Sequence, residues 1–366
     1  MKTQNQQIAS VQFLRATAAL LVVLMHNQIF FRDYAHLTGD PIPTMSGWYR
    51  FLPFGGVGVH IFFVISGFIM GHLHERTPTQ SFGAFVANRF TRIVPLYWIV
   101  AAVCAWNAPS LDPEFVIESL LFIPVHGVFP LVGVGWTLNF EIFFYLLFGL
   151  IVVKMRRSIW WIAAVFAALA AIAPFTSNYV VKFYADPIAW EFVAGLVIHR
   201  VYRNRYIRDC SPLILTLGVA GLIWAMVAFN PSHNWGIRST IHWGLPSALL
   251  VLGAVSLESM GMLTRVWSFK PMQEIGAASY SLYLTHGLMF IAFNWYFLQW
   301  TGAVEYLGPD GAVIALVVCA CIVASISLRV IELPAMRLLR GNRASRSLSL
   351  QLKSSQKVNA AHGGHE

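Results

Sequence analysis

The sequence predicts an all-α, polytopic integral membrane protein with about ten transmembrane helices, whose N- and C-termini are cytoplasmic. Apolar residues make up 57% of its 366 residues and charged residues only 11%, and the mean hydropathy is +0.63. Such a composition is typical of a chain that lies mostly in lipid. The net charge of +9 would indicate nucleic-acid binding in a soluble domain, but membrane topology accounts for it here, and no nucleic-acid partner is expected.

Ten apolar segments approach or reach the length of about 17 to 25 residues that a helix needs to cross the hydrocarbon core. The third and sixth segments are short, and the apolar stretch 115–125 is interpreted as an interfacial or re-entrant piece. An even number of spans places both termini on one side of the membrane. The predicted spans are 8–30, 56–74, 93–108, 136–153, 159–175, 187–201, 212–229, 241–258, 279–298 and 312–331.

The basic residues identify that side. With a cytoplasmic N-terminus, twenty of the 25 lysines and arginines fall on the cytoplasmic side, four fall outside, and Arg15 lies within the membrane. This asymmetry follows the positive-inside rule and predicts that both termini are cytoplasmic. The four outer basic residues are Arg32, Arg50, Lys182 and Arg238.

The chain is expected to divide into a membrane domain, residues 1–337, and a basic, Ser-rich cytoplasmic tail, residues 338–366, which is predicted to be disordered. No small-residue cleavage site follows the first apolar segment, so this segment is expected to be retained. The four cysteines have no metal-binding spacing, and all but Cys210 lie in apolar spans. They are interpreted as small core residues, and no metal site is predicted.

The first span carries two ionisable residues, Arg15 and His26. A rotation of about 100° per residue places them about 20° apart around the helix axis and about 16 Å apart along it, so they line one stripe at two depths. Ionisable groups within a membrane are costly, which favours a functional role. Arg15 could instead snorkel to the headgroups and His26 could lie in the interface, but their shared face favours function.

Glu141 in the fourth span is expected at about the depth of His26, because both lie near the outer ends of their spans. A carboxylate beside an imidazole orients the ring and suits a general base, so His26 and Glu141 are the candidate catalytic residues. The alternative is that Glu141 is a buried structural ion, paired with an arginine or a backbone donor.

Arg89 and Arg92 lie three residues apart where the third span begins. Helical spacing puts both guanidinium groups on one face, which forms a fork suited to phosphates. Topology alone also places arginines at a cytoplasmic helix end. Together with Arg15, which enters from the same side, they predict a positive inner vestibule that leads outward to His26.

Other candidates carry weaker signals. His286 of the ninth span is expected at about mid-depth in the cytoplasm-facing half, where it could line the cavity or be a satisfied core histidine. Ser66 and Gly67 lie in mid-helix, where small residues favour close helix packing or a kink. His60 near an outer helix end and His72 near an inner one are expected to be interfacial.

Taken together, these segments resemble acyltransferase family 3, the integral-membrane acyltransferases that O-acetylate bacterial surface polysaccharides and some small molecules. The resemblance extends over roughly residues 8 to 337, and FFVISGFIM and WTLNFEIFFY are most similar to the exopolysaccharide-production branch. The matching pieces are the spacing from Arg15 to His26, GVGVHIFFVISGFIM, the Arg89 and Arg92 pair with the following IVPLY, GWTLNFEIFFYLLF around Glu141, SYSLYLTHG and IELPAMR.

The resemblance implies a multi-pass enzyme of the bacterial inner membrane that uses cytosolic acetyl-CoA as acyl donor and no metal. His26 would be the essential histidine, supported by Glu141, while Arg15, Arg89 and Arg92 would serve the phosphates of the donor. Expected partners are the lipid bilayer, a lipid-linked or exported carbohydrate acceptor, and the polysaccharide export machinery. Without a fused extracytoplasmic domain, the chain is expected to be the stand-alone form. Candidate cavity-lining residues are Ser66, Tyr97 and His286, and His60 stands where related sequences usually have Asp.

Two alternatives stay open. The acceptor could be a small molecule or a lipid, because no loop identifies a sugar site. In a different class, Arg15, His26 and Glu141 would line the path of a proton-coupled transporter or flippase. The two halves of the chain show no convincing internal duplication, and clustered arginines suit phosphate binding better than a neutral route.

Overall fold

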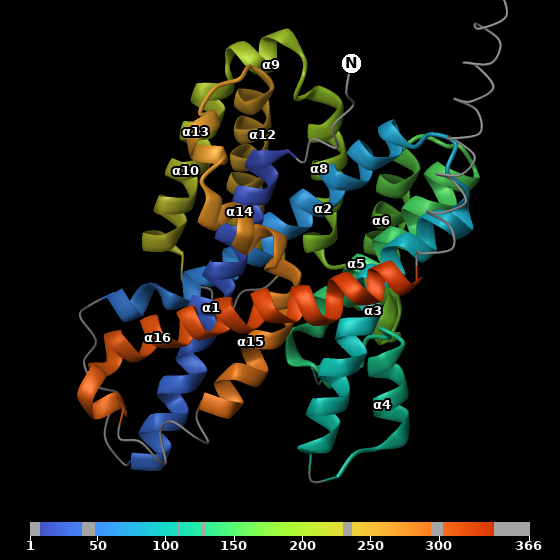
Figure 1. Ribbon diagram of the computed structural model, residues 1–366. Coiled ribbons are helices and arrows are strands. Elements are labelled where there is room, and N and C mark those ends of the chain that lie inside the picture. Colours follow the sequence, from blue (N-terminus) through green and yellow to red (C-terminus); the bar gives the residue numbers. More distant parts are fainter. Residues whose placement is uncertain are drawn as a thin grey trace, which may run out of the picture.

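The computed structural model describes residues 8–38, 48–108, 110–125, 127, 129–229, 236–293 and 303–339. All the regular elements within these ranges are helices, which confirms the predicted all-α class (Figure 1). Only the first two residues of the predicted tail, 338–366, fall within the described residues.

Seven helical segments of the described chain are long and apolar enough to cross a membrane. The predicted fifth, sixth and ninth spans correspond to three shorter helices, α6 (Trp160–Ile172), α8 (Trp190–Val201) and α15 (Ser279–Phe293). Each of the seven longer segments is formed by all or most of one helix: α1 (Ala9–Thr38), α2 (Val57–Arg76), α3 (Phe82–Trp106), α5 (Trp136–Phe148), α10 (Ser211–Ala228), α12 (Leu245–Ser259) or α16 (Ala303–Ser327).

Short helices complete the bundle. In the described part of the chain, three π-helical turns adjoin long helices: η3 (Gly149–Lys154) follows α5, η7 (Thr240–Gly244) precedes α12, and η9 (Leu328–Glu332) follows α16. The remaining elements are η1 (Trp48–Gly56), α4 (Pro113–Leu120), η2 (Gly133–Gly135), η4 (Ala173–Phe175), α7 (Tyr179–Tyr184), η5 (Pro187–Ala189), α9 (Arg205–Asp209), α11 (Ile237–Ser239), α13 (Thr264–Trp267) and α14 (Lys270–Ala277).

Many apolar side chains of the long helices face outward. Val103, Leu146, Ile223, Ile314 and Ile326 are between 40% and 64% exposed on four different helices. A soluble protein rarely exposes so much apolar surface, whereas lipid tails solvate it. The structure is therefore that of a multi-pass membrane protein, as the composition predicts.

The third predicted span starts earlier than expected. Ser81 caps α3, because its hydroxyl accepts a hydrogen bond from the backbone nitrogen of Ala84 at 3.3 Å, and the helix begins at Phe82 rather than at about residue 93. Arg89 and Arg92 therefore lie about two to three turns inside α3 rather than at its start. This places their side chains among neighbouring helices.

The stretch 115–125, predicted to be interfacial or re-entrant, forms α4 and the turn after it. It lies beside the second half of α3 (Figure 1), where the Tyr97 hydroxyl donates to the carbonyl of Ser119 at 2.9 Å and the Trp98 indole donates to that of Leu120 at 3.1 Å.

The opposite end of the molecule carries α9, α13 and the C-terminal ends of α2 and α8, and we call it the basic end. Its arginines include Arg76, Arg156, Arg157, Arg200, Arg203, Arg205 and Arg265.

Helix α2 crosses α8 through two glycines. A Cβ atom at Gly67 would lie 2.0 Å from the carbonyl oxygen of Phe192, and one at Gly195 would lie 2.0 Å from that of Val64. The two backbones can approach this closely only because both positions lack a side chain. The packing interpretation of Gly67 is therefore confirmed.

Replacing Gly67 with alanine is expected to destabilise the bundle by about 1 to 3 kcal/mol, because the added methyl group overlaps backbone atoms that have no room to move. Thermal unfolding of the purified protein in detergent measures this as a lower melting temperature. Gly83→Ala is the matched control, since open space surrounds its Cβ position on α3. Equal melting temperatures for the two variants would contradict the close crossing.

Candidate active site

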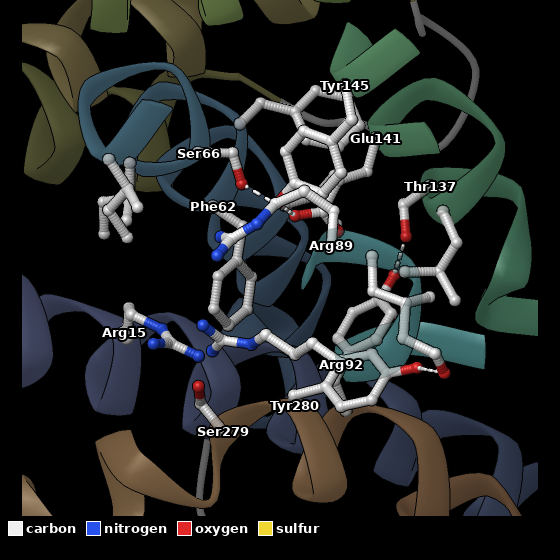
Figure 2. A pocket seen from close by; sticks show the side chains of 17 residues that line it. Arg15, Phe62, Ser66, Arg89, Arg92, Thr137, Glu141, Tyr145, Ser279 and Tyr280 are labelled. Atoms are coloured by element: carbon white, nitrogen blue, oxygen red, sulfur yellow. Dashed lines mark hydrogen bonds between the residues drawn. The ribbon is translucent and has the colours of Figure 1, made fainter. Parts of the chain in front are cut away.

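A cavity of about 80 Å³ lies where α1, α2, α3, α5 and α15 meet (Figure 2). Arg15 of α1 and Arg89 and Arg92 of α3 all line it, as the vestibule prediction requires. Figure 2 shows the guanidinium groups of Arg15 and Arg92 directed toward each other, with Ser279 of α15 beside them and Arg89 on the side of Ser66. The structure thus brings the three predicted arginines together.

Two carboxylates compensate part of this charge. Glu332 and Glu141 are the negative groups that act on Arg15, while Arg92 repels it. Glu332 of η9 is 5% exposed, and its Oε2 accepts a hydrogen bond from the Ser281 hydroxyl at 2.8 Å. Three positive and two negative side chains leave this group with an excess positive charge, which favours an anionic ligand.

Glu141 is held by two hydroxyl groups. Its Oε1 accepts hydrogen bonds from Ser66 of α2, at 3.0 Å, and from the Tyr145 hydroxyl one turn further along α5. All three residues line the cavity (Figure 2). The carboxylate is therefore fixed beside the arginines.

His26 pairs with a second histidine. Its Nδ1 lies 2.9 Å from the carbonyl oxygen of Val22 and 3.2 Å from Nε2 of His286 on α15. The two ring centroids are 4.8 Å apart. His286 is buried, and its Nδ1 lies 3.0 Å from the carbonyl oxygen of Leu282.

These contacts assign the tautomers of the two neutral rings. A carbonyl oxygen only accepts hydrogen bonds, so Nδ1 carries the proton in both His26 and His286. The unprotonated Nε2 of His286 can then accept from Nδ1–H of His26. The Nε2 of His26 keeps its lone pair on the other side of the ring, where it can act as a base.

The hydrogen-bond partner of His26 is thus His286 rather than Glu141, its expected neighbour. The hydrogen bonds of His26 join it to Val22 and His286, whereas those of Glu141 join it to Ser66 and Tyr145. Two side chains at a similar depth in the membrane touch only if their helix faces point toward each other. Glu141 faces α2, whereas His26 faces α15. Among the described residues, the hydrogen-bond partners of Glu141 are hydroxyl groups, so its contacts match neither the imidazole partner nor the arginine or backbone partner of the two interpretations.

His286 was expected in the cytoplasm-facing half, but it meets His26. The reason is that α14 already runs beside the start of α1, where Gln273 donates from Nε2 to the carbonyl of Ala9 at 2.9 Å. Helix α15 therefore begins at the level of Arg15, which shares the cavity with Ser279. Two turns later, His286 reaches the level of His26.

Of the three candidate cavity-lining residues, Ser66 lines the cavity, and His286 contacts His26 instead. Tyr97 lies in the apolar core, where it is fully buried, packs against Phe122 and donates to α4. Its hydroxyl is used to anchor α4, so it does not face the arginines.

Several cavity residues were not singled out from the sequence. Thr137 and Tyr145 lie four residues before and after Glu141, and this helical spacing would have placed them on its face. Tyr283 donates to or accepts from the Thr137 hydroxyl at 2.8 Å, and Tyr280 donates to the carbonyl of Ile93 at 2.6 Å. These hydroxyl groups hold α5, α15 and α3 around the cavity.

A second histidine–carboxylate pair lies outside this cavity. His60, expected to be interfacial, is completely buried, and its Nδ1 is hydrogen-bonded to Glu191 of α8, which is 3% exposed. The prediction for His60 was wrong because α8 and Trp243 cover it. The signal for Glu191 was a lone carboxylate within an apolar segment.

At the basic end, His72, Glu75 and His199 have possible ligand atoms within 4.8 Å of one another. Glu75 is already engaged, since its two oxygens accept from His199 at 3.0 Å and from Arg203 at 2.9 Å. His72, expected to be interfacial, is half-buried and packs against Phe68.

The fold and the cavity define an integral-membrane protein with a buried cationic site and a histidine pair further along the same helix. The sequence model of the acyltransferase 3 family, which describes an acyltransferase domain, matches residues 8–329. The chain therefore belongs to this family of membrane-embedded acyltransferases, and it is an O-acyltransferase.

Three relatives are similar over most of this chain. The exopolysaccharide production protein ExoZ of Rhizobium meliloti (strain 1021) is 30% identical over 314 residues, which cover 81% of this chain and 94% of ExoZ. Nodulation protein 10 of Rhizobium leguminosarum bv. viciae is 27% identical, with 92% and 95% covered. The O-acetyltransferase OatA of Staphylococcus aureus is 23% identical, with 78% and 53% covered. No solved structure matches the chain.

Proposed function

We propose that this protein transfers an acetyl group from cytosolic acetyl-CoA to a hydroxyl group of a surface or exported polysaccharide, or of its lipid-linked precursor, in the bacterial inner membrane. The observation that carries the proposal is the layout of α1. Arg15 lies in the arginine-lined cavity, and His26, about 16 Å further along the helix, presents an unprotonated ring nitrogen.

The cavity fits the phosphate end of the donor. Arginine binds phosphates through planar, bidentate hydrogen bonds, and Arg15, Arg89 and Arg92 bring three guanidinium groups to one place. Glu141 would orient this cluster through its fixed position between Ser66 and Tyr145. The donor's phosphates and thioester lie at opposite ends of a long arm, which suits a phosphate site and a reacting site at two depths.

His26 would act as the general base. Its Nε2 takes the proton of the acceptor hydroxyl while the hydroxyl oxygen bonds to the acetyl carbon. The carbon–sulfur bond breaks as this bond forms, and the proton passes from His26 to the departing sulfur, so the products are the acetyl ester and the free thiol. His286 would stabilise the transient imidazolium by accepting from Nδ1–H of His26.

The same nitrogen would be the nucleophile in a route through an acetylated histidine. The two routes differ in one measurable property. An acetyl-histidine route releases a burst of free CoA when acceptor is absent, whereas direct transfer releases none.

His286→Leu is expected to lower the rate of transfer by about 10- to 100-fold, because the base loses the acceptor that orients it and stabilises its charged form. His286→Gln should recover part of the rate, since its amide oxygen can accept from the same N–H. Initial rates at saturating acetyl-CoA measure both variants. Equal losses in the two would indicate that His286 only fills space.

The polysaccharide acceptor is supported by the name of one relative, the exopolysaccharide production protein ExoZ, and acetyl transfer to oxygen by the name of another, the O-acetyltransferase OatA. An enzyme that acts on an exported glycan would work beside the polysaccharide export machinery. Acylation of a small molecule or lipid uses the same cavity and base, and it differs only in the acceptor.

The test uses membranes that contain the protein, radiolabelled acetyl-CoA and extracted surface glycan. Label is expected to enter the glycan and to depend on the protein. A correctly inserted protein that neither transfers label nor binds CoA, but that moves a solute across vesicles without CoA, would instead be a transporter or flippase.

A further inference from the structure

A larger cavity, of about 470 Å³, lies at the basic end of the molecule. We call it the α2–α8 cavity, because the C-terminal ends of these two helices form two of its walls; the end of α5 with η3 forms a third. Its lining residues are Gly71, His74, Glu75, Phe148, Val152, Arg156, Arg157, Ile159, Leu196, His199, Arg200 and Arg203.

The charge of this cavity is strongly unbalanced. Among the described residues, four arginines and a single carboxylate, that of Glu75, line it. Arg203 is paired with Glu75, and Arg156 donates to the carbonyl oxygen of Pro78, so these two side chains are held in place. Within the described residues, the guanidinium groups of Arg157 and Arg200 have no hydrogen bond or ion pair.

Membrane topology explains why arginines occur at this end, but it does not explain why four of them line one cavity. Arg205 and Arg265 are also exposed at the basic end, and they lie outside both cavities described above. Clefts lined by one sign of charge focus the electric field and raise the local concentration of counter-ions. The four arginines therefore favour a multiply charged anion in this cavity over dispersed solvent ions.

A metal ion fits the cavity less well, although His72, Glu75 and His199 have suitable ligand atoms. Arg203 and His199 already occupy both oxygens of Glu75. A divalent cation would displace these contacts and enter a site lined by four arginines, which repel it.

We propose that the α2–α8 cavity binds a ligand that carries two or more phosphate charges, at a site separate from the Arg15, Arg89 and Arg92 cluster. Arg157 and Arg200 supply the free charge-assisted donors, and Arg156 and Arg203 supply fixed positive charge. Two sources offer this chemistry on the side that the sequence predicts to be cytoplasmic: a phosphorylated nucleotide and phosphate-bearing anionic lipid headgroups. The proposal concerns binding alone and does not depend on acetyl transfer.

Native mass spectrometry of the purified full-length protein tests it with defined probes. One arm titrates adenosine 3′,5′-bisphosphate, and the other compares adducts of phosphatidylglycerol with adducts of the zwitterionic phosphatidylcholine. The cavity variant is Arg157→Gln with Arg200→Gln. The control variant, Arg205→Gln with Arg265→Gln, removes the same charge from the same end but from outside the cavities.

The cavity variant is expected to weaken binding of one probe by at least about tenfold, as the loss of charge-assisted hydrogen bonds implies, and the control variant by less than about twofold. Loss in the first arm identifies a nucleotide, and loss in the second identifies lipid headgroups. The single variants Arg157→Gln and Arg200→Gln repeat the comparison in case the double variant does not fold.

Three results would overturn the proposal. Wild-type protein that binds neither probe lacks the site. Equal weakening in cavity and control variants would mean that general surface charge, rather than this cavity, attracts the probes. Zinc adducts that disappear in His199→Ala, with no phosphate adduct in the wild type, would assign the cavity to a metal instead.

Discussion

His26→Ala is expected to lower acetyl transfer by about 10²- to 10⁴-fold, the range that a positioned general base contributes. Within the described residues, Nε2 of His26 is the one ring nitrogen of the His26–His286 pair without a hydrogen-bond partner, because Nδ1 of His26 donates and both nitrogens of His286 are engaged. Binding of acetyl-CoA should remain, since the arginine cavity is lined without His26. Initial rates with radiolabelled acetyl-CoA and equilibrium binding measure the two effects separately.

The matched control for this variant is His242→Ala. His242 also lies in a membrane-spanning segment, but its ring packs against Trp224 and Phe229, away from the cavity and the histidine pair. The His242→Ala variant should transfer acetyl groups at close to the wild-type rate. Full activity in His26→Ala at matched expression would remove His26 from the chemistry and leave the proposed reaction without its general base.

Arg92→Gln is expected to raise the KM for acetyl-CoA by about 10- to 100-fold, because a charge-assisted contact to phosphate is worth about 1.5 to 3 kcal/mol. Arg92 faces Arg15 across the cavity (Figure 2). Without the Arg92 guanidinium, Arg15 would contact the phosphate from one side of the cavity alone. The kcat should change less than KM, since the side chain lies in the cavity and does not contact the His26–His286 pair. Kinetics over a range of donor concentrations separate the two constants.

Arg329→Gln provides the comparison for Arg92. Arg329 of η9 is exposed and does not line the cavity. Its substitution by glutamine removes the same charge as Arg92→Gln does. Its KM should stay within about twofold of the wild type, because exposed charges contribute little. A raised KM in both variants would show a response to overall charge, and an unchanged KM in Arg92→Gln would place the donor's phosphates elsewhere.

The histidine pair shows how a site can exceed what the sequence reveals. Spacing on α1 predicted that Arg15 and His26 share a stripe, and both do face the interior of the bundle. The partner of His26 lies 260 residues away, and the contact depends on α14 entering beside α1 and so setting the depth at which α15 starts. No local pattern encodes that offset.

Glu141 illustrates the limit of depth arguments. Counting residues from the ends of spans gives the level of a side chain but not the direction in which its helix face points. Rotation of α5 turns Glu141 toward Ser66 and the arginines, while α1 turns His26 toward α15. The facing directions of two other helices likewise place Tyr97 of α3 in the core and His60 of α2 against Glu191 of α8.

The sequence by itself determined the membrane class, the positions of most helices and the grouping of basic residues, because hydropathy and helical periodicity are local properties, and its ordered motifs indicated the family. Only the tertiary structure decided which polar side chains touch: Glu141 with Ser66 and Tyr145, His26 with His286, and His60 with Glu191. These pairings follow from the tilt, rotation and vertical offset of packed helices. Close contacts such as the one between Gly67 and α8 fix those quantities, and they join residues far apart in the chain.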